Sequence, residues 1–341
     1  MRIWIDLGNS PHVPFFNALA KDFGSRGHEI VWTARDYAQT VALARSANLD
    51  IEVFGTHGGK NIFVKSAKFA ARILDLAGWS RHRKIDMLVS HNSLEPLAVA
   101  RLFGIKSVNL MDYEHHPNNH LSFRLANKVI VPDSFPAEQL KKYGAYPRKV
   151  RRFAGIKEDV YLGTFKADPA FMDELESRFD IGPANILIVV RPHAPDALYN
   201  RRFENELLDH SLDRFAAAEN TRIVVLPRKA SQADELRARH PQPNVFVVNE
   251  ALDGANLIAS ADLVVSGGGT MNREAAAMGV PTATIFTGKP AAVDEYLCSE
   301  GRMTWMRSAE DIDAVVLRKK GVPRSRERTG VRKLVADLIL E

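Results

Sequence analysis

Short runs of apolar residues alternate along the chain with longer segments in which apolar residues recur at helical spacing. The runs predict buried strands and the longer segments predict helices that bury one face. In the first half, the predicted strands are residues 2–6, 29–33, 52–54, 87–90, 107–111 and 128–131, and the predicted helices are 14–26, 36–47 and 95–103. Strands separated by helices indicate a parallel, doubly wound sheet, whose ligands bind beyond the carboxyl ends of the strands.

The second half of the chain repeats this plan. Its predicted strands are residues 186–190, 222–226, 245–248 and 261–265, and its predicted helices lie around 200–218, 231–239 and 254–260. The pattern predicts two Rossmann-like α/β domains, residues 1–157 and 158–320. In the remaining segment, 321–341, apolar positions over 325–340 predict a final helix.

The most informative motif follows the predicted strand 261–265. It consists of five small residues, Ser266, Gly267, Gly268, Gly269 and Thr270. A helix follows over 271–279, and Pro281 cannot continue it, so the chain gives way to a second predicted strand. Glycines let backbone N–H groups approach a ligand, and the start of a helix adds unpaired N–H groups and a positive dipole end. The motif therefore predicts an anion site, most simply for a diphosphate.

Glu274 lies about one turn into that helix. Helical side chains lean toward the N-terminus, so its carboxylate is expected beside the anion rather than under it. A carboxylate repels phosphate, which makes a neutral diol such as a ribose its natural partner. The alternative is a glycine turn packed for shape, with Glu274 stabilising the helix dipole by roughly 0.3–1 kcal/mol.

These residues resemble the donor-binding segment of glycosyltransferases with two Rossmann domains (the GT-B type) and of the non-hydrolysing UDP-N-acetylglucosamine 2-epimerase. The start of the chain, MRIWIDLGNSPHVPFFNALAKDFGSRGHEIVWTARD, has the same layout of strand, small-residue loop, helix and second strand. Nearly the whole chain is similar to the uncharacterised family called domain of unknown function 354. The resemblance implies a GT-B fold, in which the two domains face each other across a cleft and the helix in 321–341 packs back on the first domain. It also implies a UDP-linked sugar as co-substrate, a glycine turn that holds the diphosphate, and Glu274 on the ribose hydroxyls.

Composition narrows the classes of protein that remain. The chain has 341 residues, 45% of them apolar, and a single cysteine, Cys298, which excludes a disulfide framework and a multi-cysteine zinc site. It has no charged start followed by an apolar signal core, and no uninterrupted apolar run reaches the length of a membrane span. We therefore expect a cytoplasmic protein.

Charge is distributed unevenly between the two halves. Residues 1–157 hold 23 Lys and Arg against 13 Asp and Glu, whereas residues 158–341 hold 23 against 28. No zinc-finger spacing, aromatic RNP-like motif or Arg-rich tail accompanies the basic half, so no nucleic-acid partner is expected. Segment 60–84 mixes apolar residues with basic ones such as Lys65, Lys68 and Arg72. It predicts either peripheral contact of these basic side chains with an anionic membrane at its inner face or an ordinary core helix.

Polar residues at predicted strand ends are the candidates for catalysis. His12 follows the first strand, and Asp112 and Glu114 follow the strand 107–111. Each is a candidate general base for an acceptor hydroxyl. The alternatives are that His12 caps the helix and that Asp112 and Glu114 belong to a polar structural loop. Metal binding by the loop is disfavoured, because neighbouring residues in an extended chain point in opposite directions and no HExxH-like spacing occurs.

The candidates for donor binding lie in the second half. Arg191 and His193 end its first strand and Arg228 follows the next, where positive groups can neutralise the charge on a departing diphosphate. Asp294 and Glu295 stand where sugar-transferring relatives often hold sugar hydroxyls, although Asp294 is also a candidate helix N-cap.

Together with this resemblance, the residues predict a metal-independent glycosyltransferase that needs no cofactor besides its nucleotide-sugar and moves the sugar to a lipid-linked or glycan acceptor. A nucleotide-sugar 2-epimerase or hydrolase is the competing enzyme. The epimerase family carries an acid where this chain has Asn92 and a Glu pair near 122–128 that is absent here, which counts against epimerisation. A non-catalytic nucleotide-sugar-binding protein is the third reading.

Overall fold

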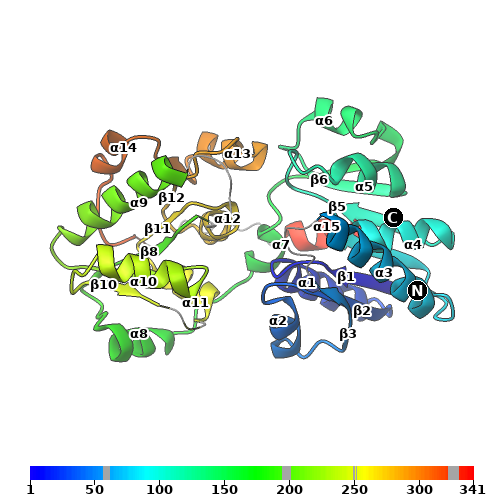
Figure 1. Cartoon of the computed structure of the whole chain (residues 1–341), viewed down its shortest axis with the longest axis horizontal. Helices are drawn as coiled ribbons and strands as arrows, with labels where there is room; N and C mark the ends of the chain where they lie inside the picture. The colour runs from blue at the N-terminus through cyan, green and yellow to red at the C-terminus, as the bar shows by residue number, and fades with distance from the viewer. Residues whose placement is uncertain (57–61, 194–200, 249, 251, 322–329) are drawn as a thin grey trace. The chain divides into compact units, whose positions relative to one another are not determined.

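The computed structural model describes residues 1–56, 62–193, 201–248, 250, 252–321 and 330–341. These residues form two compact units (Figure 1), one of Met1–Gly163 with Arg328–Glu341 and one of Thr164–Glu327. Each unit is built on a sheet whose paired strands are all parallel.

The first unit has a seven-stranded sheet in the order β3-β2-β1-β4-β5-β6-β7. Its strands are β1 (Arg2–Leu7), β2 (Glu29–Asp36), β3 (Ile51–Thr56), β4 (Met87–His91), β5 (Lys106–Leu110), β6 (Lys128–Pro132) and β7 (Val150–Phe153). Its helices are α1 (His12–Ser25), α2 (Thr40–Ser46), α3 (Ile62–Ser80), α4 (Leu94–Leu102), α5 (Asn119–Leu125), α6 (Ala137–Lys142), α7 (Asp159–Leu162) and α15 (Gly330–Leu340), with a 3₁₀ turn at Pro147–Lys149.

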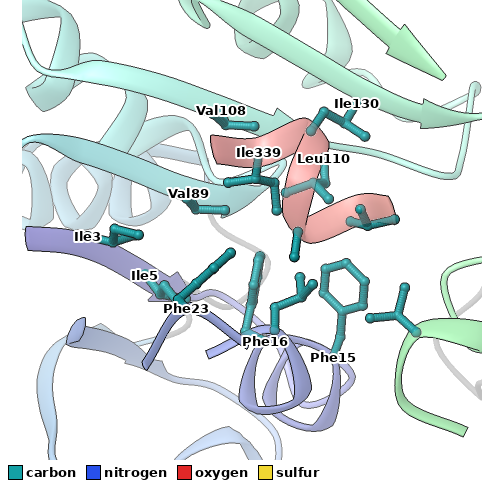
Figure 2. Packing of buried hydrophobic residues seen from close by; sticks show 14 of the residues in the cluster. Ile3, Ile5, Phe15, Phe16, Phe23, Val89, Val108, Leu110, Ile130 and Ile339 are labelled. Atoms are coloured by element: carbon teal, nitrogen blue, oxygen red, sulfur yellow. The ribbon is translucent and has the colours of Figure 1, made fainter. Parts of the chain in front are cut away.

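The C-terminal helix α15 belongs to this first unit, where it packs against α1 and α7. Figure 2 shows Ile339 of α15 in the same apolar cluster as Val108, Leu110 and Ile130 of the sheet. Lys128 Nζ donates a hydrogen bond of 2.7 Å to the carbonyl of Leu338, which satisfies an orphan carbonyl in the last turn of the helix. The chain therefore returns to the first unit to complete its core.

The second unit has a six-stranded sheet in the order β10-β9-β8-β11-β12-β13. Its strands are β8 (Ile186–Arg191), β9 (Thr221–Val225), β10 (Val245–Val247), β11 (Leu263–Ser266), β12 (Thr282–Thr284) and β13 (Thr304–Trp305). Its helices are α8 (Phe171–Phe179), α9 (Arg201–Ala216), α10 (Ala230–Arg239), α11 (Gly254–Ser260), α12 (Gly269–Met278), α13 (Ala292–Ser299) and α14 (Ala309–Asp313).

Both units confirm the predicted doubly wound α/β architecture, with two strands that the sequence pattern missed. Strand β7 is short and carries two arginines, and β13 has only two residues, so neither gives a clear apolar run. The compact units divide after Gly163, a few residues beyond the expected division after residue 157.

Candidate functional site

The glycine turn lies at the carboxyl end of β11, between β8 and β12, and its backbone is fixed by several hydrogen bonds. Gly267 N donates to the carbonyl of Arg191 at 3.0 Å, and the Ser266 hydroxyl contacts both the N–H and the carbonyl of Gly268 at 3.0 and 3.1 Å. The amide of Asn272 donates to the carbonyl of Ser266. The turn is therefore held rigidly rather than left to adapt.

Two of the glycines lie close to neighbouring groups, and Gly267 is required by space because the neighbouring atoms include backbone. A Cβ on residue 267 would lie 2.9 Å from His193 N and 3.0 Å from His193 Cβ, closer than side-chain carbons approach such atoms. A Cβ on residue 268 would lie 2.8 Å from Arg228 Nη2. The turn thus lies directly against the loop after β8 and the Arg228 side chain.

Helix α12 begins at this turn, with Gly268 as its N-cap and no side-chain cap hydrogen bond. Thr270 lies in its first turn, and Gly279, in the left-handed conformation at φ 72°, ends it. The first N–H groups of α12 therefore point out of the helix without a side-chain cap and carry the positive end of its dipole. This is the geometry that binds phosphate groups in other proteins.

Three predicted residues gather around the turn. Arg191 is the last residue of β8, His193 is buried two residues later, and Arg228 Nε donates to the carbonyl of Pro192 at 3.2 Å. Gln232 supports the loop, since its side chain accepts from Arg228 N and donates to the carbonyl of His193. The predicted positive groups are thus brought to the same strand ends as the glycine turn.

Arg191 and Glu274 interact across this site. Burial lowers the pKa of Arg191, and the nearby Glu274 carboxylate acts in the opposite direction. Glu274 is half-buried in the second turn of α12. An arginine remains charged at neutral pH, so the site combines a fixed positive charge with an acceptor carboxylate.

Asp294 forms an ion pair that the sequence did not suggest. Its carboxylate accepts two hydrogen bonds from Arg273, at 2.7 and 3.0 Å, and both side chains are buried. The N-cap of α13 is Ala291, so the capping alternative for Asp294 is wrong. Arg273 also lies 3.0 Å from where a Cβ on Gly269 would stand, which links this ion pair to the glycine turn. Glu295 is exposed on α13.

In the first unit, His12 begins α1 directly after the loop that follows β1. Its ring stacks at a tilt on that of His91, with 4.8 Å between centroids, and makes no side-chain cap hydrogen bond. His91 Nε2 lies 3.3 Å from Asp112 Oδ1, and Lys157 Nζ lies 2.9 Å from Asp112 Oδ2. We call these four residues the histidine cluster.

Burial is the main cause that lowers the pKa of His12 well below its usual value, and the nearby His91 and Lys157 charges act in the same direction. Asp112 opposes them. Since the imidazole is neutral at physiological pH, one ring nitrogen can accept a proton. His12 Nδ1 is buried and has no hydrogen-bond partner among the residues that the structure describes. This nitrogen is therefore an acceptor of the cluster without a described hydrogen-bond donor.

Glu114 is buried two residues beyond Asp112 but contacts other groups. Its carboxylate lies 3.4 Å from His115 Nε2, and its carbonyl accepts a 2.6 Å hydrogen bond from the Tyr143 hydroxyl. Of the two candidate carboxylates, Asp112 is therefore the one joined to His91 and Lys157. In the described part of the chain, no group of three His, Cys, Asp or Glu side chains is spaced to hold a metal ion.

The expectation for segment 60–84 needs one correction. Arg72, expected among its exposed basic residues, is only 1% exposed and pairs with Asp6 at 2.7 Å. Leu76 and Trp79 are buried in the core as a core helix requires, whereas Lys65 and Lys68 are exposed. Residues 57–61 lie outside the described part of the chain. Across the helices that are described, none has the length and apolar character that crossing a bilayer demands.

Sequence reasoning missed three participants. His91 ends β4, Lys157 follows the missed strand β7, and Arg273 lies on α12 next to Glu274. The position of His91 at a strand end was a usable signal, whereas Lys157 and Arg273 acquire their partners only through the fold.

Comparison with known proteins confirms the family and the fold. The model of the family described as "Protein of unknown function (DUF354)" matches residues 1–341. An uncharacterized protein of Methanocaldococcus jannaschii, MJ0665, is 29% identical over 314 residues, which cover 92% of this chain and 89% of that protein.

Two solved structures illustrate the fold. The UDP-GlcNAc 2-epimerase from Neisseria meningitidis bound to UDP-GlcNAc is similar with a TM-score of 0.71 at 11% identity over 100% of both chains. The glycotransferase of kitacinnamycin is similar with a TM-score of 0.61 at 13% identity, over 99% of this chain and 98% of that one. At such identities the likeness shows the GT-B type of fold and no particular reaction.

Proposed function

Because the chain belongs to the DUF354 family, whose description assigns no activity, we propose its function from the site: transfer of a sugar from a nucleotide-diphospho-sugar to an acceptor hydroxyl. The observation that carries this proposal is the rigid glycine turn, which sets the uncapped start of α12 beside Arg191 and Glu274. Enzymes of the same fold act on or bind UDP-sugars, which favours UDP as the carrier.

The donor diphosphate would bind at the start of α12 and Arg191. Backbone N–H groups and a guanidinium stabilise the charge that develops as the bond between the sugar C1 and the phosphate oxygen breaks. Glu274 would accept hydrogen bonds from the ribose hydroxyls. These fixed positive groups supply what a metal ion supplies in other transferases, so the proposed reaction requires none.

The acceptor oxygen would attack C1 while a base takes its proton. Neutral His12 is our candidate for that base, because burial keeps its pKa low and its Nδ1 is unbonded within the described structure. Asp112, held between His91 and Lys157, would position His91 beside the His12 ring. We expect a lipid-linked or glycan acceptor and an enzyme that acts in the cytoplasm or at the inner face of the membrane.

The second candidate is a nucleotide-sugar epimerase or hydrolase, which the likeness to a 2-epimerase favours. The third is a binding protein without catalysis. Incubation with sugar-labelled UDP-GlcNAc and a membrane extract separates the three. Label in lipid or glycan supports transfer, isomerised or hydrolysed donor supports the second candidate, and unchanged donor that still binds supports the third.

A thermal-shift panel of UDP, GDP, dTDP and CMP tests the nucleotide site before any acceptor is known. A ligand at 100 times its dissociation constant stabilises the protein by about 2.7 kcal/mol. We expect UDP to give the largest shift. No shift with any of the four nucleotides, in both the wild type and the Glu274→Ala variant, would contradict the proposed site.

A further inference from the structure

A pocket of about 190 Å³ lies in the first unit, and none of its lining residues belongs to the histidine cluster. It is lined mainly by positive side chains, and its principal residues are Arg35, Lys65, Lys68, Arg72, Thr56 and Glu95. Arg35 and Thr56 stand at the carboxyl ends of the neighbouring strands β2 and β3. The pocket is therefore at the ligand-binding edge of the sheet.

The charges around this pocket do not cancel. Arg72 pairs with Asp6 at 2.7 Å and lies 3.5 Å from Glu95, which also pairs with Arg35. The two carboxylates thus balance the two guanidinium groups. Lys65 and Lys68 add two further formal positive charges to the lining of the pocket, and Lys68 Nζ also donates to Thr56 Oγ1 at 2.7 Å. The net formal charge of these lining residues and Asp6 matches that of a phosphate monoester or of part of a diphosphate.

Arg72 is a built part of this pocket rather than a mobile surface charge. It is 1% exposed, and its Nε donates to the carbonyl of Phe54 at 2.9 Å. Gly55, at φ 75°, leaves the room that its side chain occupies, since a Cβ there would lie 3.0 Å from Arg72 Cδ. Arg72 Nη1 is buried, lies 3.5 Å from Glu95 Oε2 and makes no hydrogen bond within the described residues. A guanidinium that is fixed in place and keeps hydrogen-bonding capacity is suited to an incoming oxygen anion.

The sheet order places this pocket near the histidine cluster. Strands β2 and β4 flank β1, so their backbones lie two strand spacings apart, on the order of 10 Å. Arg35 is near the end of β2 and His91 ends β4. Glu95 of the pocket and His91 are also only four residues apart. A molecule of ordinary size can therefore reach both.

We propose that this pocket binds a phosphate group, and that the group belongs to the acceptor whose hydroxyl reaches the histidine cluster. Phosphate binding is inferred from the pocket residues alone, whereas the assignment of this phosphate to the acceptor rests on the proposed function. The acceptor class is then a phosphorylated one, either a lipid with a phosphate headgroup or a soluble phosphate ester.

Isothermal titration with inorganic pyrophosphate tests the pocket. The full chain is saturated with UDP so that the second unit is occupied, and wild type is compared with Lys65→Ala/Lys68→Ala. These lysines are exposed, so the fold should be retained. The control is Lys141→Ala/Lys142→Ala, which removes the same charge from exposed positions on α6. We expect at least tenfold weaker binding in the pocket variant and less than twofold in the control.

Equal losses in the two variants, or no loss in the pocket variant, would overturn the proposal. Its failure is distinct from failure of the proposed function. If UDP does not bind but the pocket variant still loses pyrophosphate affinity, the phosphate pocket stands and the nucleotide site falls. If UDP binds but the pocket variant keeps the wild-type affinity for pyrophosphate, the phosphate pocket is wrong and the nucleotide site stands.

Vesicle sedimentation separates the two sources of phosphate, with phosphatidic acid vesicles compared with phosphatidylcholine alone. A lipid phosphate is supported if the wild type binds phosphatidic acid vesicles and the pocket variant loses both this vesicle binding and its affinity for pyrophosphate. Pyrophosphate binding without vesicle binding supports a soluble phosphate ester. Loss of vesicle binding with pyrophosphate affinity unchanged would mean that the lysines act only as surface charge, and would overturn the pocket.

Discussion

Gly267 lies so close to His193 that a Cβ on residue 267 would stand 2.9 Å from the backbone nitrogen of His193. This close contact joins the end of β11 to the loop after β8. It fixes the position of the backbone N–H groups that we propose bind the diphosphate. Because the neighbour is backbone and cannot rotate away, Gly267→Ala should displace the turn. We expect a loss of UDP affinity of at least tenfold in a thermal-shift or calorimetric titration.

The matched control for this change is Gly254→Ala at the start of α11, where a Cβ meets nothing within 4 Å. It should leave UDP affinity unchanged. If Gly267→Ala binds UDP as tightly as the wild type, the diphosphate does not depend on this turn.

Arg191→Gln should weaken UDP binding about ten- to hundredfold while the chain stays folded. The reason is the loss of a charge-assisted contact to phosphate, worth about 1.5–3 kcal/mol. Arg237→Gln is the control, since Arg237 is exposed and pairs with Asp234 within α10. Calorimetry of UDP and uridine on both variants checks the assignment: Arg191 should affect UDP far more than uridine, and an equal loss for both ligands would argue against diphosphate contact.

Glu274→Gln should reduce the preference for UDP over its 2′,3′-dideoxy analogue. The carboxylate is the proposed acceptor for the ribose hydroxyls, so the variant should lose affinity for UDP but little for the analogue. Glu295→Gln, an exposed change on α13, should preserve the wild-type preference. An unchanged preference in the Glu274 variant would mean that the carboxylate does not bind the ribose hydroxyls.

The fold followed from the sequence because its determinants are local. Apolar runs marked most strands of both sheets, and the glycine turn and Glu274 lie within nine residues of one another. Strand β7 escaped notice because Arg151 and Arg152 interrupt its apolar pattern.

The contacts within the site depended on tertiary structure. Asp112 meets His91 and Lys157 only because parallel strands end at one edge of the sheet. Arg72 looked like a surface charge because nothing local shows that Asp6, 66 residues away, is its buried partner. Such long-range ion pairs have no periodic signature in sequence.

His12→Gln should lower kcat by about 10²–10⁴-fold, the usual contribution of a general base, with a small change in KM. The pH profile gives a sharper test. The base must be neutral to act, and burial lowers the pKa of His12, so wild-type kcat/KM should stay high below pH 6.5 and fall only at more acidic pH. A fall centred at or above pH 6.5 would point to a different base. Asp112→Asn, which loosens His91, should reduce kcat less than His12→Gln does.

His240 should make the second unit more stable at acidic than at alkaline pH. It is buried, and its ring nitrogens lie 2.8 Å from Asp209 and 3.0 Å from Asp213, which raises its pKa, chiefly through the hydrogen bond with Asp209. A raised folded-state pKa gives stability that is fully present below the unfolded pKa of about 6.5 and is lost as pH rises through the folded value. Scanning calorimetry should therefore show His240→Gln destabilising the protein by on the order of 1 kcal/mol at pH 6, and by less at pH 9. His210→Gln, which removes an exposed contact with Asp313, should cost less at pH 6. A destabilisation by His240→Gln that is the same at both pH values would mean that the ring acts through packing and not through its charge.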